Sequence, residues 1–192
     1  ADDGRLFESD GLYGNSQVRE VDARSGATLR RHANERHVFG EGIEVVDGKL
    51  VQLSWKNRLA FEYNLTDLSL LRQFDLKVGS EGWGLTHDGS TLYLTDSGHE
   101  LFHLSQETYG LVKRLAIVDP RLGHRRVYGV NELEWVEGEL WGNVFPMYQH
   151  KASQCIVRID ASSGHVLGWI DAHGLFDRQS ERVRRQPMDA VL

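Results

Sequence analysis

One carboxylate in the sequence stands where a buried strand is expected. Glu41 lies between Gly40 and Gly42, directly after Phe39 and ahead of an apolar run that begins at Ile43. An ionised side chain is costly to remove from water, so a carboxylate at the mouth of such a strand needs a use. Burial raises the pKa of a carboxyl group toward neutrality, where it can exchange protons with a substrate. Glu41 is therefore a candidate for acid–base chemistry.

Aromatic and amide side chains occupy similar places elsewhere in the chain. Trp83 is flanked by two glycines, and Asn131 begins the run NELEWVEG. Trp55 ends the strand that follows the Glu41 segment, and Phe145 ends the corresponding strand GNVF. One carboxylate, one carboxamide and several aromatic rings would make a small-molecule pocket. Taken singly, an aromatic residue at such a position is more often part of a core, and Asn131 is equally suited to closing a turn.

A zinc-protease pattern, H-E-x-x-H, occurs at residues 99–103 as HELFH. The pattern holds zinc only on a helix, where residues four apart are neighbours. Here it continues as an alternating strand, which would place His99 and His103 about 13 Å apart. We therefore expect no metal site at these residues.

Self-similar segments run along the chain. Each opens with a glycine turn and a short apolar strand, as in GRLFES, GKLVQLSW, GSTLYLTD and GELWGN, which begin at Gly4, Gly48, Gly89 and Gly138. Further alternating strands follow, divided by hairpin turns at Ser25-Gly26, Thr66-Asp67 and Ser163-Gly164. Three units also have an apolar run before the shared glycine, which we take as the innermost strand. Four strands per unit and a period near 45 are typical of a β-propeller blade.

The number of units predicts the extent of the ring. The first unit lacks the run before Gly4, and another such run begins at Ala190-Val191-Leu192. Four units and two fragments suggest an all-β, five-bladed β-propeller, with 1–192 as a single domain that is incomplete at both ends. The one expected helix is the polar, basic segment LFDRQSERVRRQ at 175–186.

Composition excludes several partners. The formal net charge of −6 and the pI of about 5.8 argue against binding to nucleic acid or to an anionic membrane. No apolar run approaches the length of a membrane span. The single cysteine, Cys155, lies in an apolar run and is expected to be a buried thiol rather than a nucleophile.

Several of these runs, taken in order, resemble a known family. The runs are LFESDGLYGNS, FGEGI, LSW, EGWGLT, NELE, GNVF and GWIDAHGL. Together they resemble the plant and bacterial type of glutaminyl cyclase, also called glutamine cyclotransferase. The resemblance covers essentially the whole chain. It implies a five-bladed propeller that converts the N-terminal glutamine of a peptide or protein to pyroglutamate and releases ammonia. It also implies that no cofactor and no catalytic zinc are needed, that the enzyme is a monomer, and that it is secreted or periplasmic.

The resemblance assigns roles to individual residues. Glu41 matches the catalytic carboxylate, Phe39, Trp55 and Trp83 match pocket aromatics, and Asn131 matches a polar contact to the substrate. Phe145 stands where the family usually has tryptophan, and two of the family's strands, one before LFES and one after AVL, are absent from this sequence. Two other interpretations remain open. One is a calcium-dependent propeller hydrolase, such as a lactonase, using Glu41, Asn131 and Glu134, and the other is a non-catalytic peptide-binding propeller.

Overall fold

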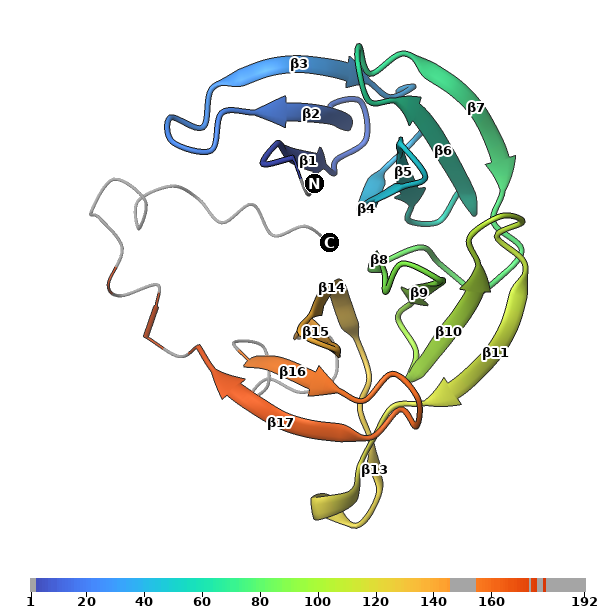
Figure 1. The fold of residues 1–192 in the computed structure, drawn as a ribbon, viewed down its shortest axis with the longest axis vertical. Coiled ribbons are helices and arrows are strands. Elements are labelled where there is room, and N and C mark those ends of the chain that lie inside the picture. The colour runs from blue at the N-terminus through green and yellow to red at the C-terminus, as the bar shows by residue number, and fades with distance from the viewer. Residues whose placement is uncertain (1–2, 146–154, 173, 176–177, 179–192) are drawn as a thin grey trace.

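The chain forms an all-β molecule. The computed structural model describes residues 3–145, 155–172, 174–175 and 178. Four antiparallel sheets stand around a common centre, with one strand of each sheet near the centre and another at the rim (Figure 1). This is a propeller-like arrangement of four blades.

The blades follow the chain in order. Blade 1 has three strands, β1 (Leu6–Asp10), β2 (Gln17–Val21) and β3 (Thr28–Ala33). Blade 2 consists of β4 (Gly40–Val46), β5 (Lys49–Ser54), β6 (Leu59–Asn64) and β7 (Leu70–Asp75). Blade 3 consists of β8 (Leu85–His87), β9 (Thr91–Thr95), β10 (Glu100–Ser105) and β11 (Leu111–Ala116). Blade 4 consists of β14 (Val130–Val136), β15 (Glu139–Val144), β16 (Cys155–Ile159) and β17 (Val166–Asp171).

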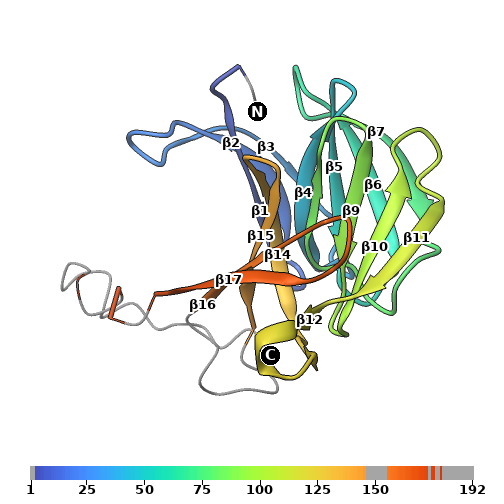
Figure 2. The same ribbon diagram turned by 60° about the horizontal axis from the view of Figure 1, so that its bottom comes forward.

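A short insertion separates blades 3 and 4. It contains β12 (Val118–Asp119), the 3₁₀ helix η1 (Pro120–Leu122) and β13 (Arg125–Arg126), and it projects from the body of the propeller (Figure 2). The Asp119 side chain accepts a hydrogen bond from the backbone nitrogen of Arg121, and Gly123 ends the turn in the left-handed region at φ 67°. The sequence did not predict this insertion, which accounts for the longer spacing between the third and fourth units.

The predicted repeat is confirmed. The run before each shared glycine forms the innermost strand of its blade, as β4, β8 and β14, and each expected hairpin joins two antiparallel strands. In HELFH, His99 immediately precedes β10 and residues 100–103 lie on it, so the segment continues as a strand and not as a helix, as expected. The innermost strand of blade 3 is shorter than predicted, because it begins only at Leu85.

The count of five blades is wrong for the described residues, which supply four. Blade 1 has no innermost strand, because β1 pairs with β2 and therefore corresponds to the second strand of the other blades. Two expected elements cannot be compared with the structure. The final strand at 190–192 lies outside the described residues, and so does the helix at 175–186 except for residues 175 and 178.

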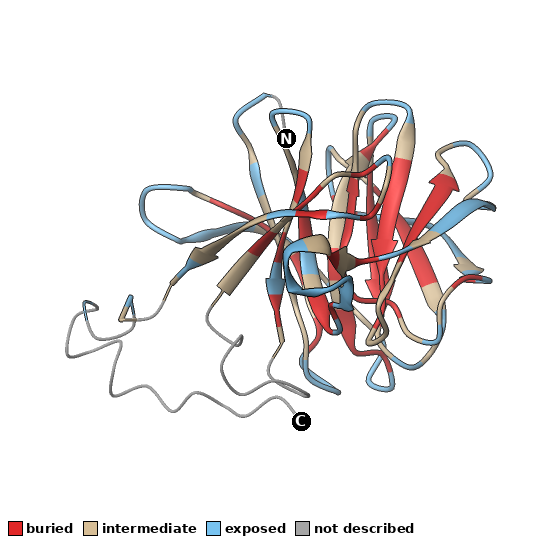
Figure 3. Ribbon diagram, turned by 90° about the horizontal axis from the view of Figure 1, so that it is seen from below, coloured by how far each residue is buried: buried red, intermediate tan, exposed pale blue. Residues whose placement is uncertain are grey.

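The hydrophobic core lies between neighbouring blades. One cluster joins blades 1 and 2 around Val18 and Leu50, a second joins blades 2 and 3 around Leu53 and Leu92, and a third joins blades 3 and 4, including Leu101 and Leu140. Figure 3 shows buried residues concentrated in the strands and exposed residues in the turns. This packing fixes the relative positions of the inner strands, and therefore of the side chains that face the centre.

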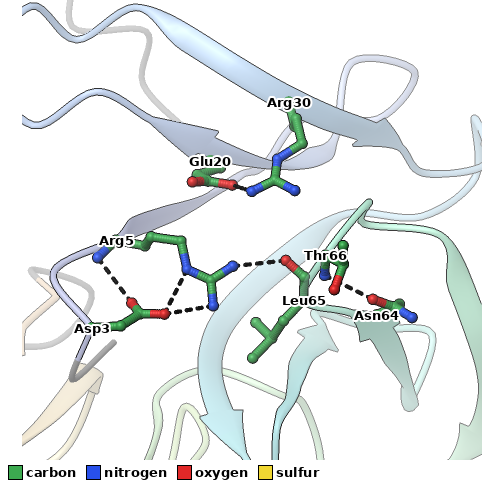
Figure 4. Close-up of polar contacts among 7 residues, drawn as sticks. All are labelled: Asp3, Arg5, Glu20, Arg30, Asn64, Leu65 and Thr66. Atoms are coloured by element: carbon green, nitrogen blue, oxygen red, sulfur yellow. Dashed lines mark hydrogen bonds and ion pairs between the residues drawn. The ribbon is translucent and has the colours of Figure 1, made fainter.

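Polar contacts also tie blade 1 to blade 2 (Figure 4). Arg5 forms an ion pair with Asp3 and donates from Nη1 to the backbone oxygen of Leu65 at 2.9 Å. In the same hairpin, the Oδ1 atom of Asn64 accepts a hydrogen bond from the backbone nitrogen of Thr66 at 2.7 Å. The Asn64-Leu65-Thr66 sequence therefore closes a turn between β6 and β7.

Candidate active site

The inner strands of blades 2 and 4 carry the same irregularity at their first residues. The pairing of β4 with β5 passes from Gly40 directly to Ile43, and the pairing of β14 with β15 passes from Val130 to Leu133. In each case two residues oppose one on the partner strand, which is a β-bulge. A bulge re-aims the side chains of its residues, and here those residues are Glu41-Gly42 and Asn131-Glu132.

Blade 3 presents an equivalent pair, Trp83-Gly84. Counting back from the turn that follows each inner strand, Glu41, Trp83 and Asn131 occupy the same position in three successive blades. The fold therefore places a carboxyl group, an indole and a carboxamide at one level around the hub, although these residues are far apart in sequence.

The glycines beside these residues allow the inner strands to approach one another. A Cβ atom at Gly42 would lie 2.3 Å from the backbone oxygen of Trp83, and one at Gly84 would lie 2.4 Å from that of Asn131. The Gly42 nitrogen also donates to the Trp83 oxygen at 2.9 Å. Gly82 meets the Ser54 backbone oxygen in the same way. The backbones of neighbouring inner strands therefore approach closely at these three glycines.

Gly40 differs because side chains, rather than backbone, face it. A Cβ atom there would lie 2.2 Å from Nε2 of Gln52 and 2.7 Å from Oγ of Ser16. The Ser16 hydroxyl accepts from the Gly40 nitrogen at 2.5 Å and donates to the backbone oxygen of Asp10 at 2.8 Å. Gln52 in turn donates to the hydroxyl of Ser9 on β1 at 2.8 Å. These contacts hold the start of β4, and with it Glu41, against blade 1.

A cavity of about 490 Å³ opens between β1, β4 and β14. Among the predicted site residues, Phe39, Glu41 and Asn131 line it. The lining residues of known position include no lysine, arginine or histidine and five carboxylates: Glu8, Asp10, Glu41, Glu132 and Glu134. The cavity therefore has a negative surface around a partly apolar wall.

The predicted aromatics divide into two groups. The Phe39 ring lies edge-on to Trp55 with ring centres 5.4 Å apart, so Trp55 stands behind the cavity wall. Trp83 is buried and lies edge-on to Phe145 at 5.9 Å. None of the three residues Trp55, Trp83 and Phe145 lines the cavity directly. The Nε1 atom of Trp83 donates to Oε2 of Glu81 at 3.0 Å, which links the indole to the carboxylates of the hub.

Burial is the main cause that raises the pKa of Glu41, which reaches about 8, and the negative charges of Glu132 and Glu81 add to the effect. The raised pKa expected from the sequence is thus confirmed. The contribution of neighbouring carboxylates was not foreseen.

Two further carboxyl groups of the cavity are perturbed. Burial raises the pKa of Glu132 to about 8, assisted by Glu134 and Glu44 and opposed by backbone N–H groups of Leu133 and Leu85. Although the Glu132 residue is exposed, the loss of hydration around its carboxyl group is the largest cause of this shift. Burial and then Glu44 raise the pKa of Glu134.

The sequence analysis missed Glu8, Asp10 and Glu81 as members of this site. Glu8 and Asp10 lie on β1, and both form ion pairs with Arg19, at 2.6 and 3.4 Å. Their alternation along LFESD was visible, but nothing in that pattern places blade 1 beside Glu41. Among the described residues, no group of three or more histidine, cysteine or acidic side chains is arranged to hold a metal ion. No helix in this part of the chain has the length and hydropathy of a membrane span.

Blades around a hub, with a carboxyl group of raised pKa in a cavity between the inner strands, define a propeller-like protein with a central site. The family model described as glutamine cyclotransferase matches residues 1–192. The chain belongs to this family.

Individual relatives agree with this assignment. The chain is 36% identical over 165 residues to the glutaminyl-peptide cyclotransferase of Arabidopsis thaliana, a match that covers 86% of this chain and 48% of that protein. The chain thus spans about half the length of this curated relative. It superposes on the crystal structure of Myxococcus xanthus glutaminyl cyclase with a TM-score of 0.77 and 25% identity, covering 91% of this chain and 69% of that one. Hydrazine synthase of Kuenenia stuttgartiensis shares the fold alone. Its TM-score is 0.54 and its identity 18%, over 81% of this chain and 43% of that one.

Proposed function

We propose that the protein is a glutaminyl-peptide cyclotransferase, which converts the N-terminal glutamine of peptides or proteins to pyroglutamate and releases ammonia. The observation that supports this best is the pKa of Glu41, raised to about 8 in a hub cavity that belongs to a member of the glutamine cyclotransferase family. The names of the Arabidopsis and Myxococcus relatives agree with this reaction.

The chemistry requires one proton to change place. The α-amino nitrogen attacks the γ-carboxamide carbon of the same residue, a new C–N bond closes the ring, and the bond to the amide nitrogen breaks. The attacking nitrogen must lose a proton, and the departing nitrogen must gain one to leave as ammonia. A single carboxyl group that takes the first proton and returns it to the second satisfies both needs.

The pKa of Glu41 suits this role. A free peptide α-amine has a pKa of about 7.7–8.0. Since Glu41 has a pKa of about 8, proton exchange between the two groups is nearly balanced in free energy. A carboxyl group with its ordinary pKa would leave the amine protonated and unable to attack.

The other predicted residues are assigned by position. Asn131 lines the cavity and is the candidate donor to the carboxamide oxygen, on which negative charge develops. Phe39 supplies an apolar wall, and Trp55 supports it from behind. Trp83 and Phe145 are proposed to contact the substrate beyond the cavity wall, and Trp83 also holds Glu81 beside Glu41.

The proposal extends to the whole protein. We infer a closed ring of five blades in a single domain, acting as a monomer in the periplasm or outside the cell. The resemblance of the sequence to the family supports each of these inferences.

The substitution Glu41→Gln tests the proton transfer. It keeps the size of the side chain and removes the titrating group, so we expect kcat on a Gln-initiated peptide to fall by about 10²–10⁴-fold. Peptide binding should change little, and the melting temperature should not fall, because the amide does not carry the cost of burying an ionisable carboxyl group. Loss of one ammonia from the peptide is followed by mass spectrometry. A variant that retains more than about a tenth of the native kcat would exclude the shuttle role.

Treatment with a chelator separates the cyclase from a calcium-dependent hydrolase. A proton shuttle that uses only protein groups predicts unchanged cyclisation in EDTA. Activity that disappears in EDTA and returns with calcium or zinc would assign the protein to another class. A protein that binds the peptide without any loss of mass would instead be a non-catalytic binder.

A further inference from the structure

Glu132 occupies a position that two other blades give to glycine. The second bulge residue is Gly42 in blade 2 and Glu132 in blade 4, and the equivalent position in blade 3 is Gly84. In the first two cases a side chain is excluded, because a Cβ atom would lie within 2.4 Å of a backbone oxygen of the next blade. A long acidic side chain at the equivalent place is a departure from the internal repeat.

The Glu132 side chain is held in place by backbone groups. Its Oε1 atom accepts a hydrogen bond from the Leu133 nitrogen at 3.0 Å, and the Leu85 N–H also stabilises the carboxylate. The backbone nitrogen of Glu132 donates to Oδ1 of Asn143 at 2.9 Å, which anchors the bulge itself. These bonds fix the carboxylate in the cavity that contains Glu41.

The two carboxyl groups differ in their hydrogen-bond partners. Glu132 receives N–H donors that favour its ionised form, whereas no such donor stabilises the Glu41 carboxylate in the described part of the chain. Two nearby carboxylates cannot both ionise easily in a site of low polarity. The negative charge is therefore better placed on Glu132, and the proton on Glu41.

Other charged groups face this pair. Glu81 precedes β8, Glu44 lies on β4, Glu134 lies on β14, and β1 contributes Glu8 and Asp10. The last two are paired with the guanidinium of Arg19. Within the described residues, the charge that raises the pKa of Glu41 most strongly is that of Glu132.

We propose that Glu132 is a positioning residue of this site: it takes the first negative charge of the Glu41–Glu132 pair and thereby keeps the transferable proton on Glu41. The proposal rests on the proposed function, since it concerns the acid–base chemistry of Glu41. It assigns to Glu132 an electrostatic role without any contact between Glu132 and the reacting atoms.

Direct titration of the full-length protein tests this role without relying on activity. The infrared band of protonated carboxyl groups is followed against pH, and Glu41→Gln identifies the component that belongs to Glu41. In Glu132→Gln the Glu41 midpoint should fall by roughly one pH unit. Glu132→Asp keeps the charge and should shift it less. Glu107→Gln removes an equal charge from an exposed turn and is the matched control.

The kinetic consequence follows the titration. In Glu132→Gln, the limb of the kcat/KM profile that reports Glu41 should move to lower pH together with the infrared midpoint. The proposal would be overturned if the Glu41 midpoint agreed within about 0.3 pH unit in the native protein, Glu132→Gln and Glu107→Gln. Shifted midpoints in a protein that cyclises no Gln-initiated peptide would support the coupling and overturn the proposed function.

Discussion

The close approach of blades 2 and 3 can be tested at Gly42. In Gly42→Ala the new Cβ atom would lie 2.3 Å from the Trp83 oxygen and 3.0 Å from the Leu85 nitrogen, both backbone atoms. An ordinary contact is about 3.4 Å or longer, so the strands must separate by roughly 1 Å. The Gly42–Trp83 hydrogen bond of 2.9 Å would be strained by the same movement.

Two effects of this substitution can be given magnitudes. Overpacking at a rigid contact costs about 1–3 kcal/mol of unfolding free energy. For a domain of this size, that corresponds to a fall in Tm of roughly 2–12 °C. Glu41 directly precedes Gly42, so it moves with the strand. A displacement of about 1 Å in a catalytic group costs about 10²-fold in rate.

The assay combines a thermal melt with kcat/KM on a Gln-initiated peptide. Gly168→Ala on β17 is the matched control, because its Cβ atom would come no closer than 3.5 Å to the flexible Arg158 side chain. We expect Gly168→Ala to behave as the native protein does. If Gly42→Ala melted within about 1 °C of the native protein and kept its kcat/KM within about threefold, the reasoning on the hub contact would be refuted.

Two other predictions concern the inner strands. The buried hydroxyl of Thr86 donates to Glu44 at 2.8 Å and accepts from the Trp135 backbone nitrogen at 3.1 Å. Thr86→Val should therefore lower the unfolding free energy, measured by urea titration, by about 1–3 kcal/mol. An unchanged urea midpoint would argue against this bridge. Glu41 and Glu132 have raised pKa values of about 8 and bind protons more tightly in the folded state, so stability should decline as pH rises from about 4.5 to about 8. This decline should be shallower in Glu41→Gln, and equal slopes in both proteins would contradict the raised pKa of Glu41.

Much of the fold could be predicted because each blade is a local structure. Alternating strands and glycine turns recur in every unit, so the strand order and the hairpin positions follow from short-range patterns. The insertion around η1 was missed, since its strands of two residues carry no periodicity. The fifth blade was predicted from the run that the first unit lacks before Gly4 and from the run that begins at 190–192; the first unit forms a blade of three strands, and 190–192 lie outside the described residues.

The candidate site was only partly predictable. Glu41 could be recognised because a charged residue in an apolar strand conflicts with its local surroundings. Glu81 gave no comparable signal, since an acidic residue in a short polar run is compatible with a solvated turn. Glu132 lies in the run NELEWVEG, which we take as an innermost strand, but nothing in the sequence distinguishes it from its neighbours there. Trp83 and Trp55 were expected to line a pocket, but they stand behind or beside the cavity wall.

The sequence by itself determined the type of each blade, the identity of the residues at the bulges and the glycines that permit close contact. These depend on backbone preference and on side-chain alternation, which act over a few residues. Tertiary structure alone decided that Glu41, Glu132 and Glu81 share one environment. The pKa values of Glu41 and Glu132 depend on burial and on charges contributed by three different blades, and such interactions exist only once the inner strands have met around the hub.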